Sequence, residues 1–160
     1  MHKQVVDPVF ERFLVPSDRA QATHELAARG ALAVPLLQAL FSGQATNQNG
    51  VAYRQLGMPL DCGLVAASHL GQLARPLEPY LREELIKGHP YAAQALGSLG
   101  TLENESILGL AAALQGNVLL AFEAANALAR CHALAHPAIK EAAATSSSAA
   151  KALAGVAANA

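Results

Sequence analysis

The chain has 160 residues, of which 52% are hydrophobic, and its 11 basic and 12 acidic residues give a formal net charge of −1. This length suits one domain with an ample core, and a chain without surplus positive charge lacks the electrostatic footprint of a nucleic-acid-binding protein. Alanine is abundant and tryptophan is absent, which favours closely packed helices and predicts an all-α fold.

The first segment, residues 1–16, carries an early positive charge but no apolar stretch before the acidic Asp7 and Glu11. A cleaved secretion signal is therefore not expected, and we interpret the segment as an N-terminal cap. The longest apolar run, from Ile107 to Phe122, is interrupted by a Gln-Gly-Asn sequence, so no transmembrane helix is expected.

A helical hairpin is predicted next. Ser17 can cap a helix from about Asp18 to Arg29, and Gly30 can adopt the left-handed conformation that ends it. A second helix follows over residues 32–42 and is closed by Gly43.

Residues 44–58 are polar and rich in turn-forming residues, which predicts an irregular insertion loop. Insertions in repeat proteins tend to lie on one face, which is often the face that binds a partner. The alternative is a mobile connector with a short helix near Tyr53.

More helices follow in pairs. Pro59 can start a helix that runs to about residue 74, Pro76 breaks it, and a partner helix ends at Lys87-Gly88. His-Pro steps at Pro90 and Pro137 act as punctuation before new helices. The remaining predicted helices span residues 90–99, 104–115, 117–132 and 149–158, and the last belongs to a C-terminal capping segment, residues 146–160.

One short motif recurs along these helices. Ala92–Leu96, Ala124–Leu128 and Ala149–Leu153 share the pattern Ala-Ala-x-Ala-Leu, and Ala66–Leu70 is a looser version. The copies are separated by 26, 32 and 25 residues, which is in the range of helical repeats. A helical unit laid down repeatedly is therefore predicted.

The stretch from Ala92 to Gly100, Ala-Ala-x-Ala-Leu-Gly-x-Leu-Gly, resembles the short bacterial HEAT repeats of the phycobilisome lyase type. The resemblance implies one α-α solenoid domain over residues 1–160, with about four to five hairpins. Asn117 and Leu120 depart from the Asp and Arg common in this family. The family's second helices line a concave groove, which would hold Gln38, Arg82, Glu83, Lys87, Glu105, Lys140 and Glu141.

Residues that could perform catalysis or bind a metal are scattered. Cys62 and Cys131 lack metal-ligand spacing and are typical of buried thiols in a reducing cytosol. His24-Glu25 resembles one of the iron-binding pairs of HEAT-like deoxyhypusine hydroxylases, but it is a single pair where that family uses several. Cys131, His132 and His136 diverge on a helix and would need distant help to hold a metal. We therefore expect no enzyme activity, no metal and no cofactor.

Protein recognition remains as the predicted role. Aromatic and arginine side chains carry much of the energy of protein interfaces, so the predicted contact residues are Tyr53, Arg54, Tyr80, Arg82, Glu83, Lys87 and Glu105. Helix-surface side chains packing on the next hairpin are the alternative for each tyrosine.

The resemblance favours a cytoplasmic bacterial immunity protein that inhibits a toxin by binding it in the groove. An adaptor or assembly factor, including a chromophore-lyase-like subunit, is the alternative, followed by a metal-dependent enzyme. The Ala-rich C-terminus could also meet a second copy of the chain.

Overall fold

The computed structural model describes residues 7–158, and the regular secondary structure of these residues is helical apart from one isolated β-bridge between Thr46 and Ala52. The predicted all-α class is confirmed. None of the described helices is long and apolar enough to cross a membrane. In chain order the helices are α1 (Pro8–Arg12), α2 (Arg19–Ala28), η1 (Gly30–Leu32), α3 (Ala33–Ser42), η2 (Tyr53–Leu56), α4 (Met58–Leu70), η3 (Gly71–Leu77), α5 (Glu78–Ile86), α6 (Pro90–Gly97), α7 (Asn104–Ala113), α8 (Val118–Arg130), α9 (Pro137–Thr145) and α10 (Ser147–Ala158).

The chain divides into two compact units, residues 1–80 and residues 81–160. The boundary between them falls within α5. In the N-terminal unit, α2 packs against α4, while α3 packs against α4 and η3. The short α1 packs against α2 and buries Phe10 and Phe13 completely. The described part of the predicted N-terminal cap therefore completes the core of this unit, and residues 1–6 lie outside the described residues.

The predicted insertion loop is locally ordered by its own side chains. The side-chain oxygen of Asn47 accepts hydrogen bonds from the backbone nitrogens of Asn49 (2.9 Å) and Val51 (3.0 Å). The bridge between Thr46 and Ala52 closes the same loop at its base. An asparagine that replaces backbone partners in this way is the usual means of holding a tight turn.

Two helix boundaries in this unit differ from the sequence-based prediction. The N-cap of α2 is Asp18, not Ser17, and its side chain makes no capping hydrogen bond. The start of α2 is instead attached to the preceding turn, because Nε of Arg19 donates to the carbonyl of Phe13 at 2.8 Å. The helix that begins near Pro59 ends at Leu70, well before Pro76, since Gly71 takes a φ of +58° that an α-helix cannot continue through.

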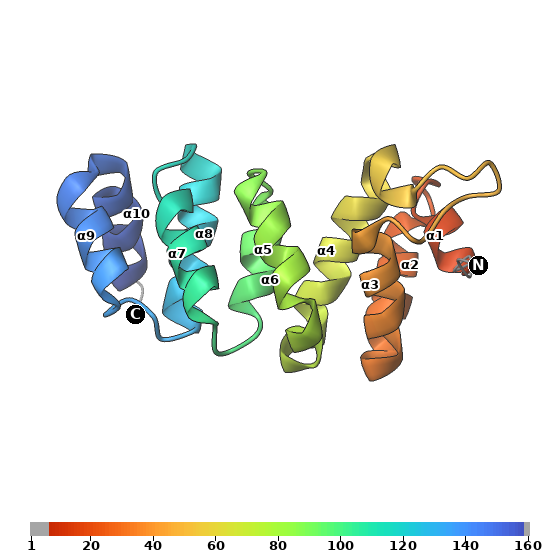
Figure 1. The fold of residues 1–160 in the computed structure, drawn as a ribbon, viewed down its shortest axis with the longest axis horizontal. Helices are drawn as coiled ribbons and strands as arrows, with labels where there is room; N and C mark the ends of the chain where they lie inside the picture. Colours follow the sequence, from red (N-terminus) through yellow and green to blue (C-terminus); the bar gives the residue numbers. More distant parts are fainter. Residues whose placement is uncertain (1–6, 159–160) are drawn as a thin grey trace. The chain divides into compact units, whose positions relative to one another are not determined.

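Helices of the C-terminal unit lie in two layers (Figure 1). One layer contains α6, α8 and α10, with α6 packed against α8 and α8 against α10. The other layer contains α7 and α9, which pack against each other. Helix α7 also contacts α8 of the first layer. The three copies of the Ala-Ala-x-Ala-Leu motif lie on α6, α8 and α10, which are the helices of the first layer. The alanines and the leucine of the motif are buried in α6 and α8, where Leu96 and Leu128 are fully buried, whereas in α10 only Ala149 of the motif is buried.

Three predicted helix starts of this unit are capped by side chains. Asn117 accepts from the backbone nitrogen of Leu120 at 2.9 Å, and Nδ1 of His136 accepts from that of Ala138 at 3.1 Å. Ser146 does the same for Ala149 at 3.3 Å. Each cap satisfies a backbone donor that a helix start leaves without a partner. The prediction that the His-Pro step at His136 is punctuation is confirmed.

Candidate functional site

Two of the predicted contact residues are used inside the N-terminal unit. Tyr53 is only 4% exposed, its ring lies 5.3 Å from that of Phe10, and its hydroxyl donates to Oε1 of Glu11 at 2.7 Å. The guanidinium of Arg54 donates to the carbonyl of Phe41. These side chains fasten the insertion loop to α1 and α3, so Tyr53 offers no exposed ring to a partner.

The predicted contact residue Tyr80 is half-buried at the end of the N-terminal unit. Its hydroxyl accepts a long hydrogen bond of 3.4 Å from Nε2 of Gln38. Gln38 is one of the residues that the HEAT resemblance assigns to a groove, so these two predicted side chains lie together on α5 and α3.

Arg82 and Glu105, both predicted contact residues, are joined in the C-terminal unit. Nη2 of Arg82 lies 3.2 Å from Oε2 of Glu105, and Nη1 lies 3.2 Å from Oε2 of Glu103. Nη1 also donates to the hydroxyl of the buried Ser106 at 3.2 Å. The Arg82 side chain is only 17% exposed, whereas the two carboxylates are 54% and 75% exposed. The guanidinium is thus fixed beside α7, and the acidic groups face the solvent.

Large apolar side chains lie on the same two helices. Ile86 follows Arg82 by four residues on α5 and is 78% exposed, while Leu108 follows Glu105 by three residues on α7 and is 47% exposed. Residues three or four apart share one face of a helix. The exposed Glu83 lies three residues before Ile86 and joins this face. We call the set Arg82, Glu83, Ile86, Glu103, Glu105 and Leu108 the α5/α7 surface.

A buried side chain of α5 lies close to α7 beside this surface. A Cβ atom added to Gly109 of α7 would lie 3.3 Å from Cδ2 of the buried Leu85 of α5. The glycine therefore leaves room for the Leu85 side chain beside α7. The pattern-based prediction missed Ile86, Glu103 and Leu108, although the four-residue interval from Arg82 to Ile86 could have indicated the first.

Lys87 has a different role from the other predicted contact residues. Its ammonium lies 3.4 Å from Oε1 of Glu84, whose side chain is 1% exposed. Nε2 of His89 lies 3.7 Å from the other oxygen of Glu84. A buried carboxylate is costly unless charges or hydrogen bonds compensate it, so Lys87 belongs to the group that stabilises Glu84.

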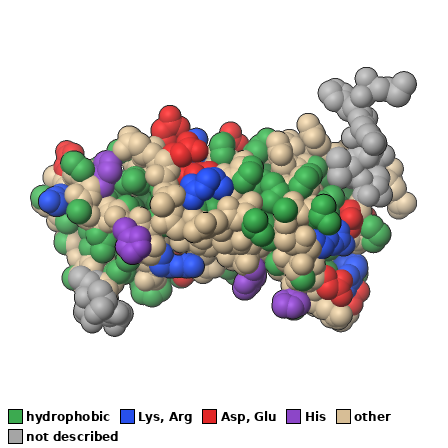
Figure 2. Space-filling model, turned by 90° about the horizontal axis from the view of Figure 1, so that it is seen from below, with side chains coloured by type: hydrophobic (Ala, Val, Ile, Leu, Met, Phe, Trp, Pro, Cys, Tyr) green, Lys and Arg blue, Asp and Glu red, His purple; other side chains and the backbone are tan. Residues whose placement is uncertain are grey.

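Mixed charge is also visible at a larger scale. In the space-filling view, acidic and basic side chains lie next to one another in mixed groups, with hydrophobic side chains between the groups (Figure 2). This distribution agrees with the net charge of −1.

Metal-binding side chains do not converge in the described part of the chain. Residues 7–158 contain no cluster of three or more His, Cys, Asp or Glu side chains suited to a metal ion. Cys131 is buried and its thiol donates to the carbonyls of Leu96 (3.6 Å) and Gly97 (3.5 Å). Burial raises the pKa of the Cys62 thiol, which disfavours the reactive thiolate.

The α5/α7 surface therefore combines a fixed arginine, exposed carboxylates and exposed apolar side chains, which is a composition suited to recognition.

The sequence matches no protein-family model, no curated protein and no solved structure.

Proposed function

We propose that the protein is a non-catalytic protein-binding module, built as an α-α solenoid of HEAT-like hairpins. The layers of the C-terminal unit support this architecture, because the motif helices α6, α8 and α10 follow one another in one layer and α7 and α9 lie in the other. In such an array each hairpin buries its apolar stripe against its neighbours, and the second helices remain available to a partner.

The observation that carries the binding role is the α5/α7 surface. Ile86 and Leu108 expose apolar area beside Arg82, whose guanidinium is already held by Glu103 and Glu105. Arginine is enriched among the residues that dominate binding energy, and a side chain that is ordered before binding loses less entropy on association. The surface thus offers both apolar and polar groups, as stable interfaces do.

Charge indicates what kind of partner surface fits. Glu83 and Glu105 are exposed acidic side chains one helical turn before Ile86 and Leu108, and the exposed Glu103 lies at the start of α7. A complementary partner presents apolar side chains flanked by lysine or arginine, because opposite potentials steer association and disfavour wrong partners.

The specific role that we propose is that of a cytoplasmic immunity protein. It would cover a bacterial toxin and so block its active surface, an interface of about 800 Å² per partner. Inhibition by occlusion requires a complementary surface and no chemistry of its own.

Affinity capture with a matched pair of variants tests this proposal. Ile86→Asp replaces an apolar contact of the α5/α7 surface by a charged side chain that binding would strip of water, and Leu32→Asp makes the same change at a 76% exposed leucine of the N-terminal unit. We expect the wild type and Leu32→Asp to co-purify with one protein in a stoichiometric complex, and Ile86→Asp to lose it. The purified partner should then be inhibited by the wild type. A complex that survives Ile86→Asp, or a captured partner whose activity is unchanged, would contradict the proposal.

A further inference from the structure

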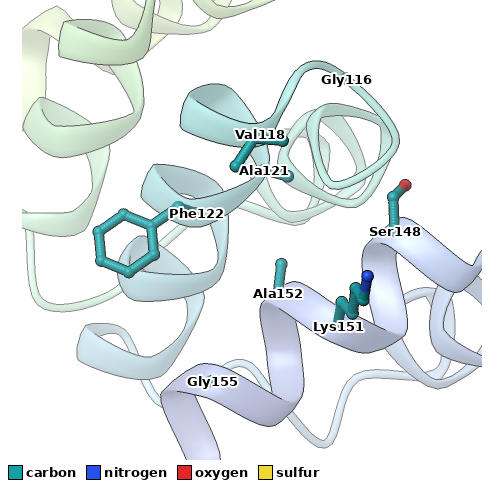
Figure 3. A pocket seen from close by; sticks show the side chains of 8 residues that line it. All are labelled: Gly116, Val118, Ala121, Phe122, Ser148, Lys151, Ala152 and Gly155. Atoms are coloured by element: carbon teal, nitrogen blue, oxygen red, sulfur yellow. The ribbon is translucent and has the colours of Figure 1, made fainter.

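An apolar groove of about 330 Å³ lies between α8 and α10 in the C-terminal unit (Figure 3). Val118, Ala121 and Phe122 line it from α8, and Ala152 and Gly155 line it from α10. Val118 is 88% and Phe122 49% exposed, which is unusual for large apolar side chains on adjacent turns of one helix. Ser148, Lys151 and Gly116 complete the lining.

Gly155 keeps the groove open. A Cβ atom added there would meet no heavy atom within 4 Å, whereas one added to Gly97 or Gly116 would lie 2.9 Å or 2.8 Å from a neighbouring atom. Glycine is among the least favourable residues inside a helix, and close helix packing does not require it at this position. Its effect in α10 is to leave space beside Ala152 that any side chain would occupy.

The polar part of the groove is cationic. Lys151 is exposed and is the one charged residue of the lining, and no described carboxylate forms an ion pair with it. Ser148 lies three residues earlier on α10, and its hydroxyl makes a long contact of 3.5 Å with the carbonyl of Leu114. Ser148 lies in the first turn of α10, where the backbone dipole also favours an anion, and Lys151 follows three residues later.

We propose that this groove binds an alkyl carboxylate of medium chain length, with the carboxylate at Lys151 and the hydrocarbon chain along α8 and α10. Small-molecule sites are mainly apolar with a few placed polar groups, and about 300 Å³ is the lower end of their usual volume. The groove has room for roughly ten groups of the size of a water molecule. From Ser148 to Gly155 it extends about 10 Å along the helix axis. These dimensions fit a chain of roughly ten carbon atoms.

The site is separate from the α5/α7 surface, because the two share no residue. Failure of one proposal can therefore be told apart from failure of the other. Partner capture tests the α5/α7 surface, and ligand titration tests the groove.

Titration of the full chain with decanoate, followed by calorimetry and by amide chemical shifts, tests the proposal. We expect saturable binding with shifts confined to α8 and α10, and affinity that rises about fourfold for each methylene group from hexanoate to decanoate. Decyltrimethylammonium, which has the opposite charge, should bind at least tenfold more weakly.

Three variants assign the binding to the groove. Gly155→Leu fills the open space and should weaken decanoate binding at least tenfold, whereas Ala154→Leu adds the same side chain at the preceding, exposed position of α10 and should leave the binding unchanged. Lys151→Gln should weaken decanoate about tenfold and leave the binding of decanol unaffected. Equal affinity of Gly155→Leu and the wild type, equal affinity for the cationic amphiphile, or no saturable binding of decanoate would overturn the proposal.

Discussion

A Cβ atom added to Gly97 would lie 2.9 Å from the Cα atom of Ala127 and 3.1 Å from its Cβ atom. Gly97 ends α6 and Ala127 lies on α8, so the backbones of two helices of one layer touch at this point. The small residues of the recurring motif make this distance accessible, and Ala124 and Ala127 are almost fully buried there. Close approach is therefore a structural reason for the alanine content that the sequence shows.

Gly97→Ala should destabilise the fold despite the better helix propensity of alanine. The neighbouring atom is backbone and cannot rotate away, so the helices must separate, and overpacking of this kind costs about 1–3 kcal/mol. Alanine recovers at most about 1 kcal/mol of that. We expect the free energy of unfolding in urea to fall by about 1–2 kcal/mol.

Gly155→Ala is the matched control, because its new Cβ atom meets nothing within 4 Å. It should raise the free energy of unfolding by up to about 1 kcal/mol. Equal effects of the two substitutions would show that α6 and α8 are not in backbone contact.

Leu128→Asp should prevent stable folding. Leu128 is fully buried on α8, and an unpaired carboxylate in that position costs several kcal/mol in addition to the lost apolar burial. Total stabilities are about 5–15 kcal/mol, so this loss is a large fraction of the whole. Leu119→Asp changes a 57% exposed leucine of the same helix and should alter the free energy of unfolding by about 0.5 kcal/mol or less. Circular dichroism during thermal unfolding distinguishes the outcomes, and similar melting curves would mean that the buried face of α8 is misassigned.

Much of the fold could be predicted because helix ends are encoded locally. Gly30 and Gly43 take the left-handed conformations that were expected, with φ values of +62° and +85°. Asn117 caps α8 as its residue type suggests. The prediction of Ser17 as the N-cap of α2 was wrong, because a cap also depends on how the preceding turn enters the helix. Here the hydrogen bond from Arg19 to the carbonyl of Phe13 ties that turn to the helix. Such a contact is invisible to a residue preference.

Less of the candidate site could be predicted. Tyr53 is of a residue type that often anchors interfaces, but whether a tyrosine is exposed depends on tertiary contacts. In this chain Phe10 and Glu11 contact its side chain. Arg82 and Glu105 are brought together by α5 and α7 across 23 positions of sequence, a pairing that no local pattern specifies. The groove beside Gly155 has no sequence signal beyond one glycine within a helix.

Asn117→Ala should remove the cap of α8 and lower the free energy of unfolding by about 1 kcal/mol. The backbone nitrogen of Leu120 then loses the 2.9 Å hydrogen bond that the Asn117 side chain provides. Gln115→Ala is the control, because it changes an exposed side chain two residues earlier and should alter stability by less than about 0.5 kcal/mol. Urea unfolding of both variants measures the difference, and no loss for Asn117→Ala would mean that water replaces the cap without cost.

Tyr53→Phe should lower stability at neutral pH and lose that effect in alkali. The substitution keeps the ring against Phe10 but removes the hydrogen bond to Glu11, a net loss of about 1 kcal/mol.

The pH dependence follows from the titration of the phenol. Burial, together with the hydrogen bond and the negative charge of Glu11, raises the pKa of Tyr53 from 10.0 to about 12. The unfolded chain therefore releases this proton first, so the stabilisation from Tyr53 is complete below pH 10 and is lost as the pH rises to 12. Urea unfolding of the wild type and Tyr53→Phe at intervals across this range isolates the contribution, because all other titrating groups are common to both proteins. A constant difference between the two proteins up to pH 12 would contradict the buried, hydrogen-bonded position of this hydroxyl.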